Sequence, residues 1–185
     1  MARTGARVLL IDADPQGSAL DWAAARQATP LFSVVGFPRP TIHKEIAQIG
    51  HGYDHIIIDG PPRVTDLARS AIMASDIVVI PVQPSPYDIW AAEEVVKLIE
   101  EARVYKDSIK AVFVVNRKIT NTAIGRDVRD ALAAYPVHVL QASVAQRVVF
   151  AEAAAQGQAI FEVPAAGLAV AEMEAVAAEL MEYVQ

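Results

Sequence analysis

The chain has 185 residues and a formal net charge of −6, with 54% hydrophobic and 21% charged residues. This composition supplies a packed core and excludes a disordered chain, and the length predicts that residues 1–185 form a single domain. The acidic balance argues against a dedicated nucleic-acid-binding domain, although not against a local basic patch. The absence of cysteine excludes disulfides and thiolate metal sites and fits a reducing cytoplasm.

Short apolar runs rich in β-branched residues predict buried parallel strands, because strands covered on both faces read as continuous apolar segments. Helical periodicities between them predict an α/β fold with right-handed crossovers. No apolar run is long enough to span a membrane. The expected strands are Arg7–Ile11, His55–Ile58, Ile77–Val82, Ala111–Val115 and Val137–Leu140, with Ser33–Gly36 as a weaker candidate. The expected helices are Ser18–Gln27, Thr41–Ile49, Val64–Ala74, Asp88–Tyr105, Thr122–Ala134, Ala145–Gln156 and Leu168–Tyr183.

The last expected helix carries an apolar stripe that predicts packing on the sheet. A membrane-binding terminal helix is the alternative, but its polar face would need to be rich in lysine and arginine, which this helix lacks. The stripe consists of Val170, Met173, Val176, Ala177, Leu180 and Val184.

Acidic and polar side chains follow three of the expected strands. Asp12 and Asp14 follow the first strand, Asp59 follows the run of three isoleucines, and Asn116 and Arg117 follow the strand that ends in Val115. Ligands of open α/β sheets bind beyond the carboxyl ends of the strands. If these strands are neighbours, the side chains converge on one rim.

The segment RVLLIDADPQGSALDW, from Arg7 to Trp22, resembles the second-strand region of the ParA/MinD family of partition ATPases, with its D-x-D-P-Q switch. The segment HIIIDGPP is similar to the Walker B strand of that family. The similarity runs from about Gly5 to the C-terminus and is closest to small plasmid-type ParA proteins. The resemblance implies a three-layer α/β fold with a mostly parallel sheet of the P-loop NTPase type.

The resemblance also implies roles for the acidic residues. Asp14 would place the attacking water and contact the water shell of the metal, and Asp12 would support the loop. Asp59 would be the Walker B carboxylate that holds a Mg²⁺-bound water. The alternatives are turn chemistry for Asp12 and Asp14, since Asp before Pro commonly opens a turn, and a turn or helix-cap role for Asp59.

Asn116 matches a family position that reads adenine, because a side-chain amide offers both a donor and an acceptor. The alternative is a strand-end Asn that satisfies loop backbone. Arg117 would stack on the base or remain solvated. Pro84 and Ser85 match a region that borders the nucleotide and the dimer partner, and we expect Asp88 to cap the following helix.

Arg147 matches a position that would meet DNA, a partner or a phosphate, with an exposed first-turn arginine as the alternative. Four further cations could contribute to a basic face, although a solvated surface explains each of them singly. These are Lys106, Lys110, Arg126 and Arg129.

The implied activity is Mg-ATP-dependent homodimerisation, non-specific DNA binding in the ATP state, and hydrolysis stimulated by a ParB-like partner. The implied cofactors are ATP and Mg²⁺, the implied cargo is plasmid or chromosomal DNA, and the implied location is the cytoplasm, at the nucleoid if the protein binds DNA.

The family's phosphate loop has no counterpart here, since no G-x-x-x-x-G-K-[ST] segment occurs. The corresponding strand–helix unit, of about 20–25 residues, would supply a central strand, so we expect the sheet either to expose two strand edges or to rejoin differently. We predict that this chain binds ATP poorly and does not hydrolyse it. Three hypotheses remain: a partition ATPase whose sequence record starts late, a non-catalytic relative that binds a partner, and an unrelated α/β ligand-binding module.

Overall fold

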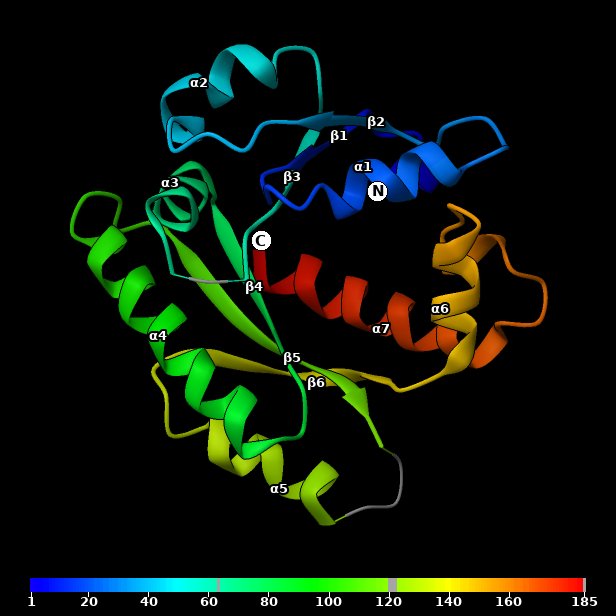
Figure 1. The fold of residues 1–185 in the computed structure, drawn as a ribbon. Coiled ribbons are helices and arrows are strands. Elements are labelled where there is room, and N and C mark those ends of the chain that lie inside the picture. The colour runs from blue at the N-terminus through cyan, green and yellow to red at the C-terminus, as the bar shows by residue number, and fades with distance from the viewer. Residues whose placement is uncertain (63, 120–122, 185) are drawn as a thin grey trace. The chain divides into compact units, whose positions relative to one another are not determined.

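The computed structural model describes residues 1–62, 64–119 and 123–184, with the side chains of these ranges except 123–127. It is a parallel α/β structure (Figure 1). Two compact units make up the chain: residues 1–75 with 153–158 form the first, and residues 76–152 with 159–185 form the second. The single domain that the length suggests stays a prediction. None of the helices in the described part of the chain has the length and apolarity needed to cross a membrane.

The first unit contains a three-stranded parallel sheet with strand order β2-β1-β3. Its strands are continuous apolar segments, and their register places Asp12, the last residue of β1, opposite Gly36 on one side and Asp59 on the other. The strands are β1 (Val8–Asp12), β2 (Ser33–Gly36) and β3 (His55–Asp59), and the helices are α1 (Ser18–Ala25), α2 (Ile42–Ile49) and α3 (Asp66–Ala74).

Helices lie on both faces of this sheet, which gives the first unit three layers. On one face Ile58 packs against a buried cluster that includes Ile42 of α2 and Ala71 of α3. On the other face α1 lies over β2, where Leu20 approaches Gly36 so closely that a Cβ atom there would be 2.7 Å from its Cδ1. Helix α1 covers this second face only in part, because Ile57 in β3 remains 42% exposed.

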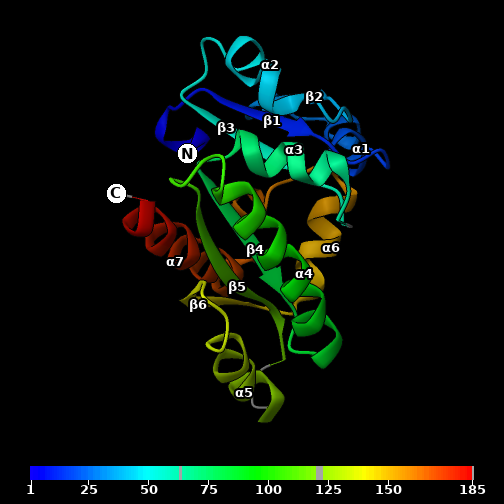
Figure 2. The same ribbon diagram turned by 90° about the vertical axis from the view of Figure 1, so that its left-hand side faces the viewer.

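The second unit contains another three-stranded parallel sheet, with strand order β4-β5-β6. Helix α7 lies on one side of this sheet and α4 on the other (Figure 2). The central strand β5 is the most buried, with Val112, Phe113 and Val115 fully inaccessible. The elements are β4 (Ile77–Val82), α4 (Pro86–Arg103), β5 (Lys110–Lys118), α5 (Ala123–Leu132), β6 (His138–Ala145), α6 (Val148–Ala155) and α7 (Gly167–Val184).

Helix α7 packs on its sheet as the apolar stripe predicts. Met173, Val176 and Leu180 contact the cluster formed by β5 and β6. The prediction that the whole stripe packs on the sheet is wrong at two positions, because Ala177 and Val184 are exposed. Tyr183 takes that place instead and stacks on His138 at a ring-centroid distance of 4.9 Å.

The sequence predicts all six strands, and the differences lie at element ends. Strand β6 continues to Ala145, so α6 begins later than expected, at Val148. Helix α4 begins at Pro86 with Ser85 as its N-cap residue, and Asp88 stands inside the first turn. The prediction that Asp88 caps this helix is therefore wrong, and its carboxylate instead complements the positive end of the helix dipole.

The two sheets end in β3 and β4, each of which pairs on one side only among the described strands. The expectation that the sheet exposes two strand edges or rejoins differently stays a prediction. The other edge of the second sheet is strand β6, and side chains of α7 cover its free backbone amides. Glu179 accepts hydrogen bonds from the backbone nitrogens of Gln141 and Ala142 at 2.6 and 2.7 Å.

Gly157 provides a test of the first unit, because it has a φ of +61° and lies against α1. A Cβ atom at this position would lie 2.4 Å from the backbone nitrogen of Arg26. We predict that Gly157→Ala lowers the free energy of unfolding by at least about 1 kcal/mol. Denaturant unfolding measures this, with Gly167→Ala as a control because nothing lies within 4 Å of a Cβ atom there. Equal stabilities of the two variants would contradict the prediction.

Candidate functional site

Asp12 is the structural centre of the loop between β1 and α1. Its side chain is buried, with 1% exposed. Oδ1 accepts a hydrogen bond from the backbone nitrogen of Asp14 at 3.2 Å, and Oδ2 accepts one from Leu20 at 2.9 Å. The carboxylate thus fastens both the start of the loop and the first turn of α1, which is the loop-supporting role that the resemblance implies.

Asp14 lies half-buried in the loop that Asp12 holds. Its Oδ1 accepts a hydrogen bond from the backbone nitrogen of Gln16 at 3.0 Å, and its carbonyl oxygen accepts one from Gly17 at 3.0 Å. Turn chemistry is therefore present at this residue. A carboxylate has two oxygens and about four lone-pair directions, so the turn leaves room for a ligand contact. The catalytic role of Asp14 stays a prediction.

Asp59 ends β3 directly beside Asp12, because the two residues are register partners. Its carbonyl oxygen accepts a hydrogen bond from the backbone nitrogen of Ala13 at 2.9 Å, which ties the loop to β3. Partial burial raises the pKa of the Asp59 carboxyl group, and the nearby charges of Asp12 and Asp14 raise it further. The site therefore concentrates negative charge and favours a cation.

The acidic residues fit only part of the Mg-ATP that the family resemblance implies. In the part of the chain that the structure describes, no three His, Asp or Glu side chains converge to hold a metal ion directly. Asp14 and Asp59 can accept hydrogen bonds from waters around Mg²⁺. Phosphate oxygens need backbone N–H groups and a lysine from a Walker A loop, and the 185 residues contain no such loop. The residues present fit the hydrated metal and do not fit the triphosphate.

Asn116 and Arg117 lie near the carboxyl end of β5, in the second unit. The Oδ1 atom of Asn116 accepts a hydrogen bond from the backbone nitrogen of Arg117 at 2.9 Å. Arg117 has a φ of 51°, a left-handed conformation that is rare outside glycine. The side chain of Asn116 thus holds local backbone, which was the alternative to an adenine contact; the adenine contact stays a prediction.

Pro84 lies half-buried in the turn between β4 and α4, where the backbone nitrogen of Ser85 donates to the carbonyl oxygen of Gln83 at 2.7 Å. The first unit thus gathers the three acidic residues, while Asn116, Arg117 and Pro84 belong to the second unit. A nucleotide contact by Pro84 and the common rim of all these residues both stay predictions.

Arg147 is not the exposed first-turn arginine that we considered. It precedes α6 and forms an ion pair with Glu172 of α7, and both side chains are about one quarter exposed. The hydrogen bond that Arg147 donates within this ion pair is the main cause that lowers the pKa of the Glu172 carboxyl group. A contact of Arg147 with DNA, a partner or a phosphate would have to compete with Glu172.

The other predicted cations also have partners within the second unit. Lys106 pairs with Asp76 at 2.9 Å, and Lys110 donates to the carbonyl oxygens of Tyr183 and Val184. Arg129 donates to the Oε1 atom of Gln141 at 2.8 Å. The side chain of Arg126 lies outside the described side chains. These contacts favour structural roles for the first three.

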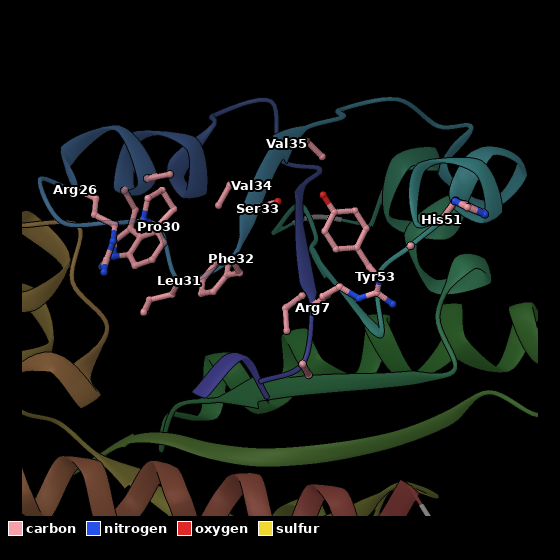
Figure 3. A pocket seen from close by; sticks show the side chains of 15 residues that line it. Arg7, Arg26, Pro30, Leu31, Phe32, Ser33, Val34, Val35, His51 and Tyr53 are labelled. Atoms are coloured by element: carbon pink, nitrogen blue, oxygen red, sulfur yellow. The ribbon is translucent and has the colours of Figure 1, made fainter. Parts of the chain in front are cut away.

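Sequence reasoning missed two features. Glu172 and Glu179 both accept hydrogen bonds from β6 amides, and their spacing of seven residues, two helical turns, was the available signal. A cavity of about 1060 Å³ in the first unit was also missed (Figure 3). Trp22 and Phe32 stack beside it at a centroid distance of 5.7 Å. Their stacking depends on the conformation of a loop, and loops carry no periodic sequence pattern that would predict it.

Comparison with known proteins identifies the family. A family model described as an AAA domain matches residues 28–112. The maintenance of carboxysome distribution protein A of Halothiobacillus neapolitanus is 32% identical over 173 residues, which cover 90% of this chain and 78% of the relative. The chain belongs to the ParA/MinD family of ATPases. Its match covers about half the length of several other curated ParA/MinD relatives.

Solved structures of similar proteins show that the fold is that of ParA/MinD P-loop NTPases, as the sequence predicts. A plasmid partition protein from Borrelia burgdorferi bound to AMPPNP has a TM-score of 0.75 at 13% identity, covering 97% of this chain and 88% of that chain. MinD from Pyrococcus horikoshii complexed with Mg-ADP has a TM-score of 0.70 at 18% identity, covering 94% and 83%. ATP and Mg²⁺ are the cofactors of the family.

The two hydrogen bonds of Asp12 predict a stability effect. Asp12→Ala leaves the backbone N–H groups of Asp14 and Leu20 without their acceptor, so the free energy of unfolding should fall by about 1–3 kcal/mol. Asp21→Ala, an exposed position on α1, should change it by less than about 0.5 kcal/mol. Urea unfolding of both variants measures the difference. Equal losses would show that the Asp12 carboxylate does not hold the loop.

The raised pKa of Asp59 predicts a pH dependence. The folded state holds the proton of this carboxyl group more tightly than the unfolded chain, so stability is lost as the pH rises from 3.8 through the raised folded pKa. Asp59→Asn removes the titrating carboxyl group and with it this loss of stability. The variant should therefore unfold at a higher temperature than the wild type at pH 7, and the difference should shrink toward pH 4. A difference that grows on acidification would contradict the predicted direction.

Proposed function

We propose that this chain carries the switch and Walker B parts of a partition ATPase that uses Mg-ATP to position a cargo inside the cell. Asp14 acts on the attacking water, and Asp59 holds a water of the Mg²⁺ shell. Asn116, Arg117 and Pro84 contribute to the nucleotide site. The protein works in the cytoplasm as an ATP-dependent homodimer that binds non-specific DNA at the nucleoid, and a ParB-like partner stimulates hydrolysis of ATP.

The observation that carries the proposal is the arrangement around Asp12. Its buried carboxylate fixes the loop that presents Asp14, and the strand register places Asp59 next to it. Partial burial of Asp59, together with repulsion from Asp12 and Asp14, raises its pKa and so costs stability at neutral pH. A cluster of acidic residues that destabilises the fold is typical of a site maintained for ligand binding. Plasmid or chromosomal DNA is the cargo that the family resemblance favours.

The second candidate function is that of a non-catalytic relative that binds a partition or regulatory partner. Under this candidate, Asp14 and Asp59 serve as partner contacts rather than as contacts to a hydrated metal. The two candidates differ in what happens when a phosphate loop is supplied.

The test compares two polypeptides for binding of a fluorescent ATP analogue with Mg²⁺ and for phosphate release. Residues 1–185 alone should bind the analogue poorly and release no phosphate. A chimera should do both when the phosphate-loop strand and helix of the Halothiobacillus relative precede Arg7. In the chimera, Asp14→Ala should lower the hydrolysis rate by roughly 100-fold.

Asp107→Ala is the matched control, because Asp107 is exposed in the turn after α4 and should leave the rate unchanged. ATP-dependent binding of the chimera to duplex DNA of arbitrary sequence, weakened by added salt, tests the DNA role. A folded chimera that binds no ATP would favour the non-catalytic relative. Hydrolysis by residues 1–185 alone that vanishes in Asp14→Ala would show that no added phosphate loop is needed.

A further inference from the structure

Strand β6 pairs irregularly with β5, its neighbour in the second unit. Between Phe113 and Val115, β5 advances by two residues, while the partners of these residues on β6, Val139 and Ser143, are four residues apart. Strand β6 therefore carries two more residues than β5 in this stretch, and the excess lies at residues 140–142. A bulge of this kind interrupts the ladder, so its backbone N–H groups need other acceptors.

A carboxylate of α7 supplies the acceptor for this bulge. The backbone nitrogens of Gln141 and Ala142 donate to Oε1 and Oε2 of Glu179 at 2.6 and 2.7 Å, and Glu179 is half-buried there. Neighbouring residues of a regular strand point their N–H groups to opposite sides. Two successive N–H groups that meet one carboxylate therefore show that Glu179 holds β6 out of its regular course.

A second irregularity follows directly, and here the excess residue is on β5. Beyond the pair of Val115 and Ser143, β5 advances by three residues and β6 by two before the strands pair again. The excess falls where Oδ1 of Asn116 accepts from the backbone nitrogen of Arg117, whose φ is 51°. A left-handed conformation is unfavourable for arginine and persists only where the surrounding contacts enforce it.

Glu172 of α7 fastens the far end of this second irregularity. Its Oε2 atom accepts a hydrogen bond from the backbone nitrogen of Ala145 at 3.1 Å, and Ala145 is the register partner of Lys118. The same carboxylate pairs with Arg147. Glu172 and Glu179 are two helical turns apart on α7, and each lies at one of the two register shifts.

The two strands have a second, regular way to pair. If the register of Phe113 with Val139 continued without a bulge, Val115 would pair with Gln141 instead of Ser143. A shift by two residues keeps every side chain on its own face of the sheet, because side chains alternate with a period of two. The apolar residues of β6 that pack against α7 would still face it. The apolar pattern therefore does not by itself select between the two registers.

We propose that Glu179 is a register lock: its carboxylate selects the irregular register of β6, and without it β6 slips by two residues against β5. In the regular register β5 has no excess residue. Arg117 then returns to extended backbone, and Asn116 releases its contact with the backbone nitrogen of Arg117. Helix α7 thus sets the geometry of Asn116 and Arg117, two residues of the proposed nucleotide site, through β6. The lock itself does not depend on nucleotide; only its relevance to nucleotide binding rests on the proposed function.

The test is nuclear magnetic resonance of the full 185-residue chain, in which Overhauser contacts between backbone protons of paired residues distinguish the registers. The unchanged chain should show a contact of Val115 with Ser143 and slow exchange of the Gln141 and Ala142 amides. In Glu179→Ala, a contact of Val115 with Gln141 should appear and that with Ser143 should weaken. The two amides should exchange faster by about tenfold or more, because they lose a charged acceptor.

Two further variants separate the lock from a general loss of packing. Glu182→Ala is the matched control, because Glu182 is exposed on the same helix three residues further on, and the register should be unchanged. Arg117→Gly favours the irregular register, since glycine adopts a positive φ without the steric cost that arginine has. Added to Glu179→Ala, it should restore the contact of Val115 with Ser143.

A folded Glu179→Ala variant that keeps only the contact of Val115 with Ser143 would overturn the proposal. The same register change in Glu182→Ala, or no restoration by Arg117→Gly, would also overturn it. If Glu179→Ala does not fold, Glu179→Gln decides, because its amide keeps one acceptor and turns a donor toward the second N–H group. Both registers should then be seen together, and the irregular register alone would contradict the lock. None of these readouts involves nucleotide, so this failure is distinguishable from failure of the proposed function.

Discussion

Parallel strand pairing is the constraint on which the rest of this structure depends. In the first unit, β1 pairs with β2 and β3, and its register alone decides that Asp12 stands beside Asp59. A shift by one residue would turn every side chain of β3 to the other face. The apolar packing of Ile58 against α2 and α3 prevents that shift. Core packing and the position of the carboxylates are therefore set by the same contacts.

Burial of Asp12 gives this residue a structural role that differs from the roles open to Asp14 and Asp59. A buried carboxylate requires hydrogen-bond partners, and Asp12 finds two in the backbone of its own loop. Asp14 and Asp59 are left more exposed, where they can meet a ligand. The pKa of Asp59 is raised by its partial burial and, to a smaller extent, by repulsion from Asp12 and Asp14. The site thus combines one structural carboxylate with two that face outward.

Membership of the ParA/MinD family establishes the fold and the cofactors of the family, while the chemistry of this chain depends on its own residues. Its 185 residues bring Asp12, Asp14 and Asp59 together and contain no Walker A segment.

The sequence by itself determined the strands, the order of elements and the acidic residues at strand ends, because apolar runs and turn residues are local signals. It also determined the family, through the segment from Arg7 to Trp22. Element ends were less predictable: Ser85 rather than Asp88 occupies the N-cap position of α4, since a proline at the first helical position fixes the start there. Only the tertiary structure decided that Arg147 pairs with Glu172, that Asn116 holds its neighbour's backbone, and that Asp12 and Asp59 are register partners. These depend on contacts between residues far apart in the chain or on loop geometry, for which no periodic pattern exists.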